Sequence, residues 1–125
     1  MIVLDGAHNP AGAEALSVAL KEFFIWARLH LVIAISANKD LDGILAELSP
    51  LTDAAYAASN NSERTGDALQ IAERLSAEGK PVKIFDGVAA ALDAARAAAA
   101  EDDLILVTGS LYTVADARRA LGTPE

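Results

Sequence analysis

Short apolar runs alternate with longer stretches of helical periodicity along the whole chain. Each apolar run has the length of a strand. The run at 29–35 is apolar almost throughout, which is typical of a strand covered on both faces of its sheet. The predicted strands are residues 1–4, 29–35, 54–58, 82–85 and 104–107.

A helix is predicted after each of these strands. Asn9 is a typical N-cap and Pro10 suits the first helical position, so the first helix begins there and continues to about 24–27. Its predicted buried side consists of Leu16, Ala19, Leu20, Phe23 and Phe24. The other helices are predicted at 41–48, 63–77, 88–100 and from the turn at 108–110 to about 121. In the helix at 63–77, the residues available for burial are Leu69, Ile71, Ala72 and Leu75.

This order of elements predicts an α/β fold. We expect a Rossmann-like, doubly wound, mainly parallel sheet with helices on both faces. No repeat or internal boundary divides the chain, so residues 1–125 are predicted to form a single domain.

Composition narrows the class of protein. Hydrophobic residues make up 53% of the chain, yet no apolar run approaches the roughly 20 residues that span a bilayer. Asp5 and His8 interrupt the start before a signal peptide could form, and there is no cysteine for a disulfide or thiolate metal site. We therefore expect a cytoplasmic protein. The net charge of −8 argues against nucleic-acid or membrane partners, although not against small anionic ligands.

Ligands of such sheets bind beyond the carboxyl ends of the strands, which directs attention to the loops at 5–10, 36–40 and 108–112. Asp5 can accept hydrogen bonds from hydroxyl groups, and His8 precedes a helix N-terminus, where it can donate to an anion. The alternative for Asp5 is a turn or cap residue, and for His8 an ordinary surface group. Lys39 lies beside a helix cap, as in many solvated turns, and Ser110 is either an anion contact or an ordinary N-cap.

Several common sites are missing from the sequence. Neither a G-x-x-x-x-G-K-[ST] phosphate loop nor a G-x-G-x-x-G fingerprint occurs. His8 and His30 are more than 20 residues apart, with no organised carboxylate cluster, so no metal site is predicted.

Three motifs carry a resemblance to a known family. The sequence D-G-A-H-N-P at 5–10 resembles the motif that opens the C-terminal domain of folylpolyglutamate and dihydrofolate synthases. N-K-D at 38–40 resembles the D-K-D loop of that family, with Asn38 replacing the first aspartate, and V-T-G-S-L-Y at 107–112 resembles its third motif. These enzymes belong to the Mur-ligase superfamily. Muramyl-peptide ligases usually have Tyr-Ala-His in place of Gly6-Ala7-His8, which favours the folate branch.

The resemblance implies an ATP-dependent amide ligase that forms an acyl phosphate and adds L-glutamate to folates, to dihydropteroate, or to both. It implies that Asp5 contacts ATP and that His8 is catalytic, positioning glutamate or the phosphate being transferred. Lys39 and Ser110 are implied to lie in the glutamate-binding region. The segment at 59–65 matches no part of the family pattern, so no role is assigned to it.

The resemblance also implies that ATP and Mg²⁺ are bound mainly by a larger N-terminal ATPase domain that this chain lacks. We expect the chain to be an inactive part of a monomeric enzyme. Two alternatives stay open at this point. One is the C-terminal domain of another Mur-like ligase, of the muramyl-peptide or cyanophycin type, and the other is a free-standing α/β binding module without catalytic activity.

Overall fold

The sheet in this computed structural model has five parallel strands in the order β1-β5-β2-β3-β4. The structure describes residues 1–37, 39–59 and 67–122. The strands are β1 (Ile2–Leu4), β2 (Leu29–Ile33), β3 (Ala54–Ala58), β4 (Val82–Phe85) and β5 (Leu104–Thr108). The last strand in the sequence therefore lies between the first two. The predicted parallel sheet is confirmed.

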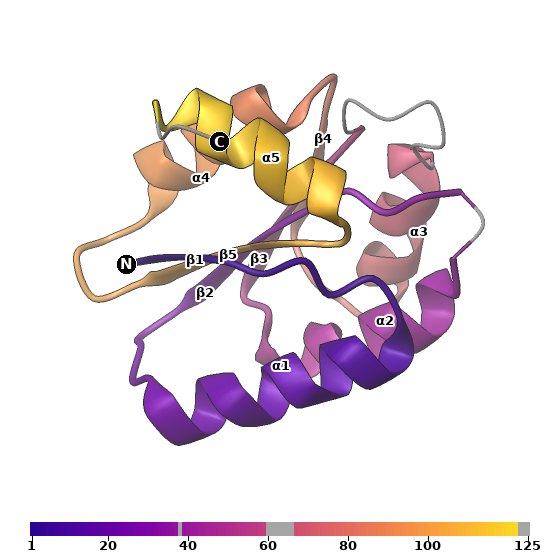
Figure 1. Ribbon diagram of the computed structural model, residues 1–125, viewed down its shortest axis with the longest axis horizontal. Coiled ribbons are helices and arrows are strands. Elements are labelled where there is room, and N and C mark those ends of the chain that lie inside the picture. The colour runs from indigo at the N-terminus through magenta and orange to yellow at the C-terminus, as the bar shows by residue number, and fades with distance from the viewer. Residues whose placement is uncertain (38, 60–66, 123–125) are drawn as a thin grey trace.

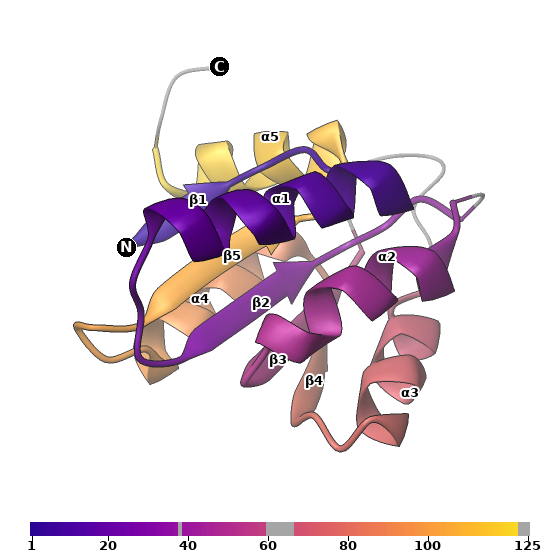
Figure 2. The ribbon, with the colours of Figure 1, turned by 90° about the horizontal axis from the view of Figure 1, so that it is seen from below.

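Helices cover both faces of the sheet, as Figures 1 and 2 show. One face packs against α1 (Pro10–Phe23), α2 (Leu41–Leu48) and α3 (Ala68–Ala77). The opposite face packs against α4 (Val88–Ala98) and α5 (Leu111–Ala120). The doubly wound arrangement predicted from the alternating pattern is thus confirmed. No helix in the described ranges is both long and apolar enough to cross a membrane.

Alternate residues of β2 enter two separate hydrophobic layers. Leu31 and Ile33 pack with α1, α2 and α3, whereas Val32 packs with α4 and α5. Every residue of β2 is buried, because the strand lies between β5 and β3 with helices on both faces. Burying one large aliphatic side chain contributes about 1.5–3 kcal/mol. This central strand is therefore firmly anchored and forms a rigid base for the loop that follows it.

Side chains at the carboxyl edge of the sheet begin four of the helices. The caps are Asn9, Asp40, Asp67 and Ser110, which accept from the backbone N–H groups of Gly12, Gly43, Leu69 and Thr113 at 2.7, 2.9, 2.8 and 3.0 Å. Each such cap contributes about 1 kcal/mol. The predicted start of the first helix at Asn9 and Pro10 is confirmed.

Several predicted element ends were wrong. The strand predicted at 29–35 ends at Ile33, and a short 3-10 helix, η1 (Ser49–Leu51), follows α2 without having been predicted. The helix predicted from residue 63 begins at Ala68, because Asp67 has an extended backbone and caps it. Residues 63–66 of that prediction, and 60–62 of the preceding loop, lie outside the described residues.

Two side chains predicted to be buried are exposed. Phe23 is the last residue of α1 and lies on the flank of a buried stripe that runs through Ala13, Leu16 and Leu20. Leu69 lies in the first turn of α3, whereas Ile71, Ala72 and Leu75 are buried as expected. In both cases an adjacent residue, Phe24 or Ala68, packs against the core instead, so the exposed side chain lies off the buried stripe of its helix.

A buried polar cluster lies toward the amino ends of the strands. The Nδ1 atom of His30 is 2.9 Å from the Tyr56 hydroxyl, and its Nε2 atom is 2.8 Å from an oxygen of Asp103. The same Asp103 oxygen accepts from the Ala100 backbone N–H at 3.0 Å. The Ala100 N–H and the His30 ring lower the pKa of Asp103, while burial raises the pKa of Tyr56. This cluster ties three segments together at the edge of the sheet opposite the loops considered next.

Candidate functional site at the carboxyl ends of the strands

The loops after β1 and β5 are joined directly by hydrogen bonds. The Gly109 N–H donates to the Ala7 carbonyl at 3.1 Å, and the Thr108 hydroxyl approaches the same carbonyl at 3.4 Å. The Asp5 N–H continues the strand pairing to Val107 at 3.0 Å. Residues more than 100 positions apart in the sequence thus form one surface.

The segment after β2 is bound to the same β5 loop. The buried Thr113 hydroxyl donates to the Ala34 carbonyl at 2.7 Å. Gly109 lies directly against this carbonyl with φ +124°, and a Cβ atom there would collide with the Ala34 oxygen. Only glycine adopts this backbone and leaves room for Ala34. The three loops predicted to hold ligand groups therefore meet, as Figure 1 shows at the right-hand end of the sheet.

Asp5 and His8 are held by short-range contacts within the first loop. One oxygen of the half-buried Asp5 carboxylate accepts from the Ala7 N–H at 2.9 Å. The exposed His8 ring places Nδ1 at 3.0 Å from the Gly6 carbonyl. A carbonyl oxygen only accepts, so Nδ1 carries the hydrogen in this arrangement. The Nε2 atom of His8 then accepts when the ring is neutral and donates only when the ring is protonated.

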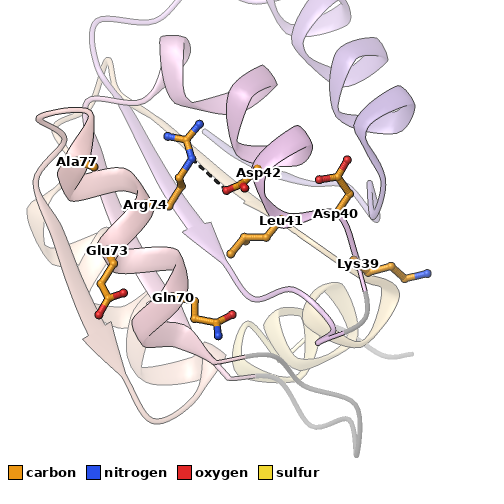
Figure 3. Close-up of a pocket in the computed structure, with 8 residues that line it drawn as sticks. All are labelled: Lys39, Asp40, Leu41, Asp42, Gln70, Glu73, Arg74 and Ala77. Atoms are coloured by element: carbon orange, nitrogen blue, oxygen red, sulfur yellow. Dashed lines mark hydrogen bonds and ion pairs between the residues drawn. The ribbon is translucent and has the colours of Figure 1, made fainter.

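Lys39 lies at the mouth of an open pocket between α2 and α3, drawn in Figure 3. The pocket has a volume of about 650 Å³ and is lined by Lys39, Asp40, Leu41, Asp42, Gln70, Glu73, Arg74 and Ala77. Across it, Arg74 contacts Asp42 at 3.1 Å and Glu78 at 2.6 Å. Lys39 points away from this network in Figure 3, and its side chain makes no ion pair with the residues that the structure describes. Its charge is therefore available to an incoming anion.

A smaller hollow connects this pocket to the end of β2. It measures about 70 Å³ and shares Lys39, Leu41 and Gln70 with the larger pocket. Its wall includes Ser36, close to the Ala34 carbonyl that Thr113 binds. Lys39 thus lines both hollows, which share three lining residues and together are called the groove. Asn38, which differs from the family motif, lies outside the described residues.

Ser110 is buried at the start of α5, with 5% of its surface exposed. Its oxygen accepts from the Thr113 N–H at 3.0 Å, which is the N-cap role anticipated as the alternative to ligand binding. The next two residues are exposed instead: Leu111 by 73% and Tyr112 by 56%. Leu111 covers Gly6, where a Cβ atom would lie 2.6 Å from its side chain. The surface beside His8 is consequently apolar.

The described residues contain no group of three or more histidine, aspartate or glutamate side chains that could hold a metal ion. Sequence reasoning also missed Thr113, the residue that joins α5 to the segment after β2. Its only local signal is its place three residues after the cap Ser110. The partner, Ala34, is 79 positions away, which no local pattern indicates.

A doubly wound parallel sheet whose strand-end loops carry polar side chains and helix N-termini is typical of α/β domains that bind small ligands. Within that class, the sequence identifies one family. Residues 1–111 match the family model described as "Mur ligase, glutamate ligase domain", and the chain belongs to this family. The resemblance predicted from the three loop motifs is thereby confirmed.

The chain is similar to folate-branch enzymes over nearly its whole length. It is 40% identical over 127 residues to the dihydrofolate synthase/folylpolyglutamate synthase of Escherichia coli strain K12, covering 97% of this chain and 29% of that protein. The structure of E. coli FolC with DHPP and ADP has a TM-score of 0.88 and 37% identity, covering 97% of this chain and 28% of that one.

A further solved structure is a bifunctional folylpolyglutamate synthase/dihydrofolate synthase with Mn, AMPPNP and L-glutamate bound. It has a TM-score of 0.86 and 33% identity, covering 97% of this chain and 29% of that one. The chain therefore spans less than a third of the length of these relatives.

Proposed function

We propose that the chain is the C-terminal, glutamate-ligase domain of a longer ATP-dependent amide ligase acting in the cytoplasm. The enzyme adds L-glutamate to folates, to dihydropteroate, or to both. The observation that carries this proposal is the 40% identity to the E. coli synthase across 97% of the chain. The ligands named for its structural relatives include ADP, which such a reaction releases, and L-glutamate, which it consumes.

The chemistry divides into activation and attack. Bound ATP supplies a phosphoryl group that converts the acceptor carboxylate into an acyl phosphate, and the glutamate amine then displaces phosphate to form the amide. Asp5 accepts hydrogen bonds from hydroxyl groups of the nucleotide. His8, with Nδ1 bound to Gly6, donates from Nε2 in its protonated form to the phosphate or to a glutamate carboxylate.

Lys39 and Ser110 belong to the glutamate-binding region in this proposal. The ammonium of Lys39 is exposed at the groove that starts beyond β2, where it attracts a carboxylate of the amino acid. Ser110 lies below the surface at the head of α5 and is held by Thr113. A cation at the surface and a fixed hydroxyl beneath it suit a small dicarboxylic amino acid.

We further propose that an N-terminal ATPase domain completes the site. The described residues of this chain lack a metal-binding cluster, so Mg²⁺ is assigned mainly to that domain. Exposed Leu111, which packs over Gly6 of the His8 loop, and its neighbour Tyr112 supply an apolar surface against which it docks. The 125-residue chain alone is then inactive, and the full-length enzyme is a monomer.

The test is phosphate release with MgATP, L-glutamate and either dihydropteroate or tetrahydrofolate. It compares the 125-residue chain with the protein extended upstream to its natural start. Activity only in the longer protein, and only with a pterin acceptor, is the expected result. Activity of the longer protein with a muramyl peptide instead would assign another Mur-like acceptor. Phosphate release by the short chain, or no phosphate release by either protein with any acceptor, would overturn the proposal.

A further inference from the structure

The hydrogen bonds at the head of α5 form a chain with a defined direction. Thr113 Oγ1 donates to the Ala34 carbonyl at 2.7 Å, and Ser110 Oγ lies 3.0 Å from the same Thr113 oxygen. A threonine hydroxyl has one hydrogen, and here the carbonyl receives it. The hydrogen between the two hydroxyls must therefore come from Ser110. In the reverse direction, the Thr113 N–H donates to Ser110 Oγ at 3.0 Å.

We propose that Thr113 is a positioning residue that orients the Ser110 hydroxyl and locks it to the segment after β2. This inference rests on the proposed function, in which Ser110 belongs to the amino-acid site. Thr113 itself is fully buried, and its hydroxyl contacts Ser110 and Ala34. It belongs to none of the three loop motifs, since the third motif ends at Tyr112.

The direction of these hydrogen bonds determines which ligand groups suit Ser110. Because its hydrogen is directed to Thr113, any further contact of the Ser110 oxygen is made as an acceptor. An amine or ammonium brings the hydrogen that such a contact needs. A carboxylate would place its lone pairs against those of Ser110, which is unfavourable. The geometry therefore suits the amine of the incoming amino acid, while the exposed cation Lys39 suits its carboxylates.

Thr113 also couples two loops that lie far apart in sequence. Ala34 directly follows β2, and its own N–H pairs with the Thr108 carbonyl at 3.4 Å. With Thr113 bound to the Ala34 carbonyl, the segment leading to Lys39 is held by both backbone polar groups of one residue. Loss of the hydroxyl should loosen Ser110 and Lys39 together, because Thr113 contacts the first and holds the segment that leads to the second.

The first experiment measures steady-state kinetics of the full-length ligase carrying Thr113→Val, Thr113→Ser or Ser110→Ala. We expect Thr113→Val to raise the KM for glutamate about tenfold, the effect of one lost hydrogen bond, and to leave the KM for ATP unchanged. Thr113→Ser keeps the hydroxyl and should restore the wild-type KM. In the Ser110→Ala background, Thr113→Val should add less than its full tenfold, because the part of its effect that passes through Ser110 is already lost and only the part that passes through Ala34 remains.

Thr52→Val is the matched control. The Thr52 hydroxyl is equally buried and donates to the Leu48 carbonyl at 2.9 Å, but it lies at the amino end of β3, far from the strand-end loops. A merely structural threonine at 113 would lower stability as Thr52→Val does, without a selective change in KM. Equal KM effects at the two positions, or full additivity with Ser110→Ala, would overturn the proposal. Thr113→Ala accompanies Thr113→Val in case the latter does not fold.

Amide hydrogen exchange on the 125-residue chain separates this inference from the proposed function. The Lys39 N–H donates to the Ser36 carbonyl at 3.2 Å and reports on the second loop. Thr113→Val should accelerate its exchange at least about tenfold, as a lost hydrogen bond allows, and Thr52→Val should not. If the full-length wild type shows no ligase activity, the proposed function fails, but this measurement still decides the coupling. Unchanged Lys39 exchange in Thr113→Val would contradict it.

Discussion

At the scale of single residues, the candidate site depends on where a few hydrogens point. His8 directs its Nδ1 hydrogen to Gly6, so only the protonated ring offers a second hydrogen at Nε2. Ser110 directs its hydrogen to Thr113. Lys39 supplies donors without an ion-pair partner among the described side chains. These three groups therefore offer different chemistry, although all are hydrogen-bonding side chains near one edge.

His8→Ala in the full-length protein should reduce kcat/KM at least about 100-fold, the usual range for a group that transfers or holds a proton. The side chain is exposed, so the free energy of unfolding should change by no more than about 0.5 kcal/mol. Ligation assays and urea unfolding measure the two quantities. Glu14→Ala, an exposed change on α1, is the control and should alter neither. Parallel losses of activity and stability in His8→Ala would favour a structural role.

Asp103→Asn should weaken the dependence of stability on acid pH. The Ala100 N–H and the His30 ring lower the pKa of Asp103 from its ordinary 3.8, so the ionised form stabilises the fold at neutral pH. That contribution is fully present above pH 3.8 and is lost as the pH falls through the lower folded-state value. Urea unfolding between neutral pH and pH 3 should therefore decline less steeply in the variant. The exposed neighbour Asp102→Asn should retain the wild-type slope, and a wild-type slope in Asp103→Asn would contradict the assignment.

At the scale of elements, the turn between β5 and α5 is the most constrained segment of the site. Hydrogen bonds join it to the first loop at Ala7 and to the segment after β2 at Ala34. Gly109 has a positive φ and no space for a side chain, so the turn tolerates little change. The geometry of two neighbouring loops therefore depends on this one turn.

Gly109→Ala should cost more than twice as much stability as Gly79→Ala. Both glycines have positive φ, but nothing lies within 4 Å of a Cβ atom at Gly79, whereas one at Gly109 collides with Ala34. The conformational cost alone is about 1–2 kcal/mol, which is the expected loss at Gly79. Chemical denaturation of the two variants measures the difference. Equal losses of stability would mean that the Ala34 segment moves at little cost to make room for the Cβ atom.

The elements themselves were largely predictable, and their spatial order was not. Caps such as Asn9 and Ser110 and continuous apolar runs such as that of β2 are local signals, so most helices and strands were placed correctly. The early start predicted for α3 failed because Asp67, an equally good cap, lies inside the predicted helix. No local pattern specified that β5 inserts between β1 and β2, or that Thr113 would reach Ala34.

The same limit applied to the site. Asp5, His8, Lys39 and Ser110 were recognisable because they follow strands, and the fold brings strand ends together. Whether each side chain is exposed depends on neighbours distant in sequence. Ser110 is buried by such neighbours, while Leu111 next to it is exposed.

At the scale of the molecule, exposed apolar side chains lie at the strand-end face. Leu111 packs over Gly6 of the first loop and Tyr112 follows it, and in the proposed enzyme another domain covers both. In the isolated chain such a surface favours association between copies.

Sedimentation velocity over a range of concentrations should therefore detect self-association of the 125-residue chain. The double variant Leu111→Ser and Tyr112→Ser should reduce it, and the extended protein should remain monomeric. Ile25→Ser, at a residue that is 99% exposed near the opposite edge of the sheet, is the control. A wild-type chain that stays monomeric, or an equal reduction by Ile25→Ser, would contradict docking at Leu111 and Tyr112.

The position of β5 also has a consequence for synthesis on the ribosome. β1 lies at the edge of the described sheet and pairs with β5, which is translated after β2, β3 and β4. About 100 more residues must therefore be translated before the partner of the first loop leaves the exit tunnel. Bringing together residues so far apart in sequence is slow. A chain released before Leu104 could retain β2, β3 and β4 as neighbours, but Ala7 and Ala34 would lack the turn that joins them. Truncated products would thus lose the contacts of the candidate site first, and a nascent chain would complete this site only once β5 has been inserted.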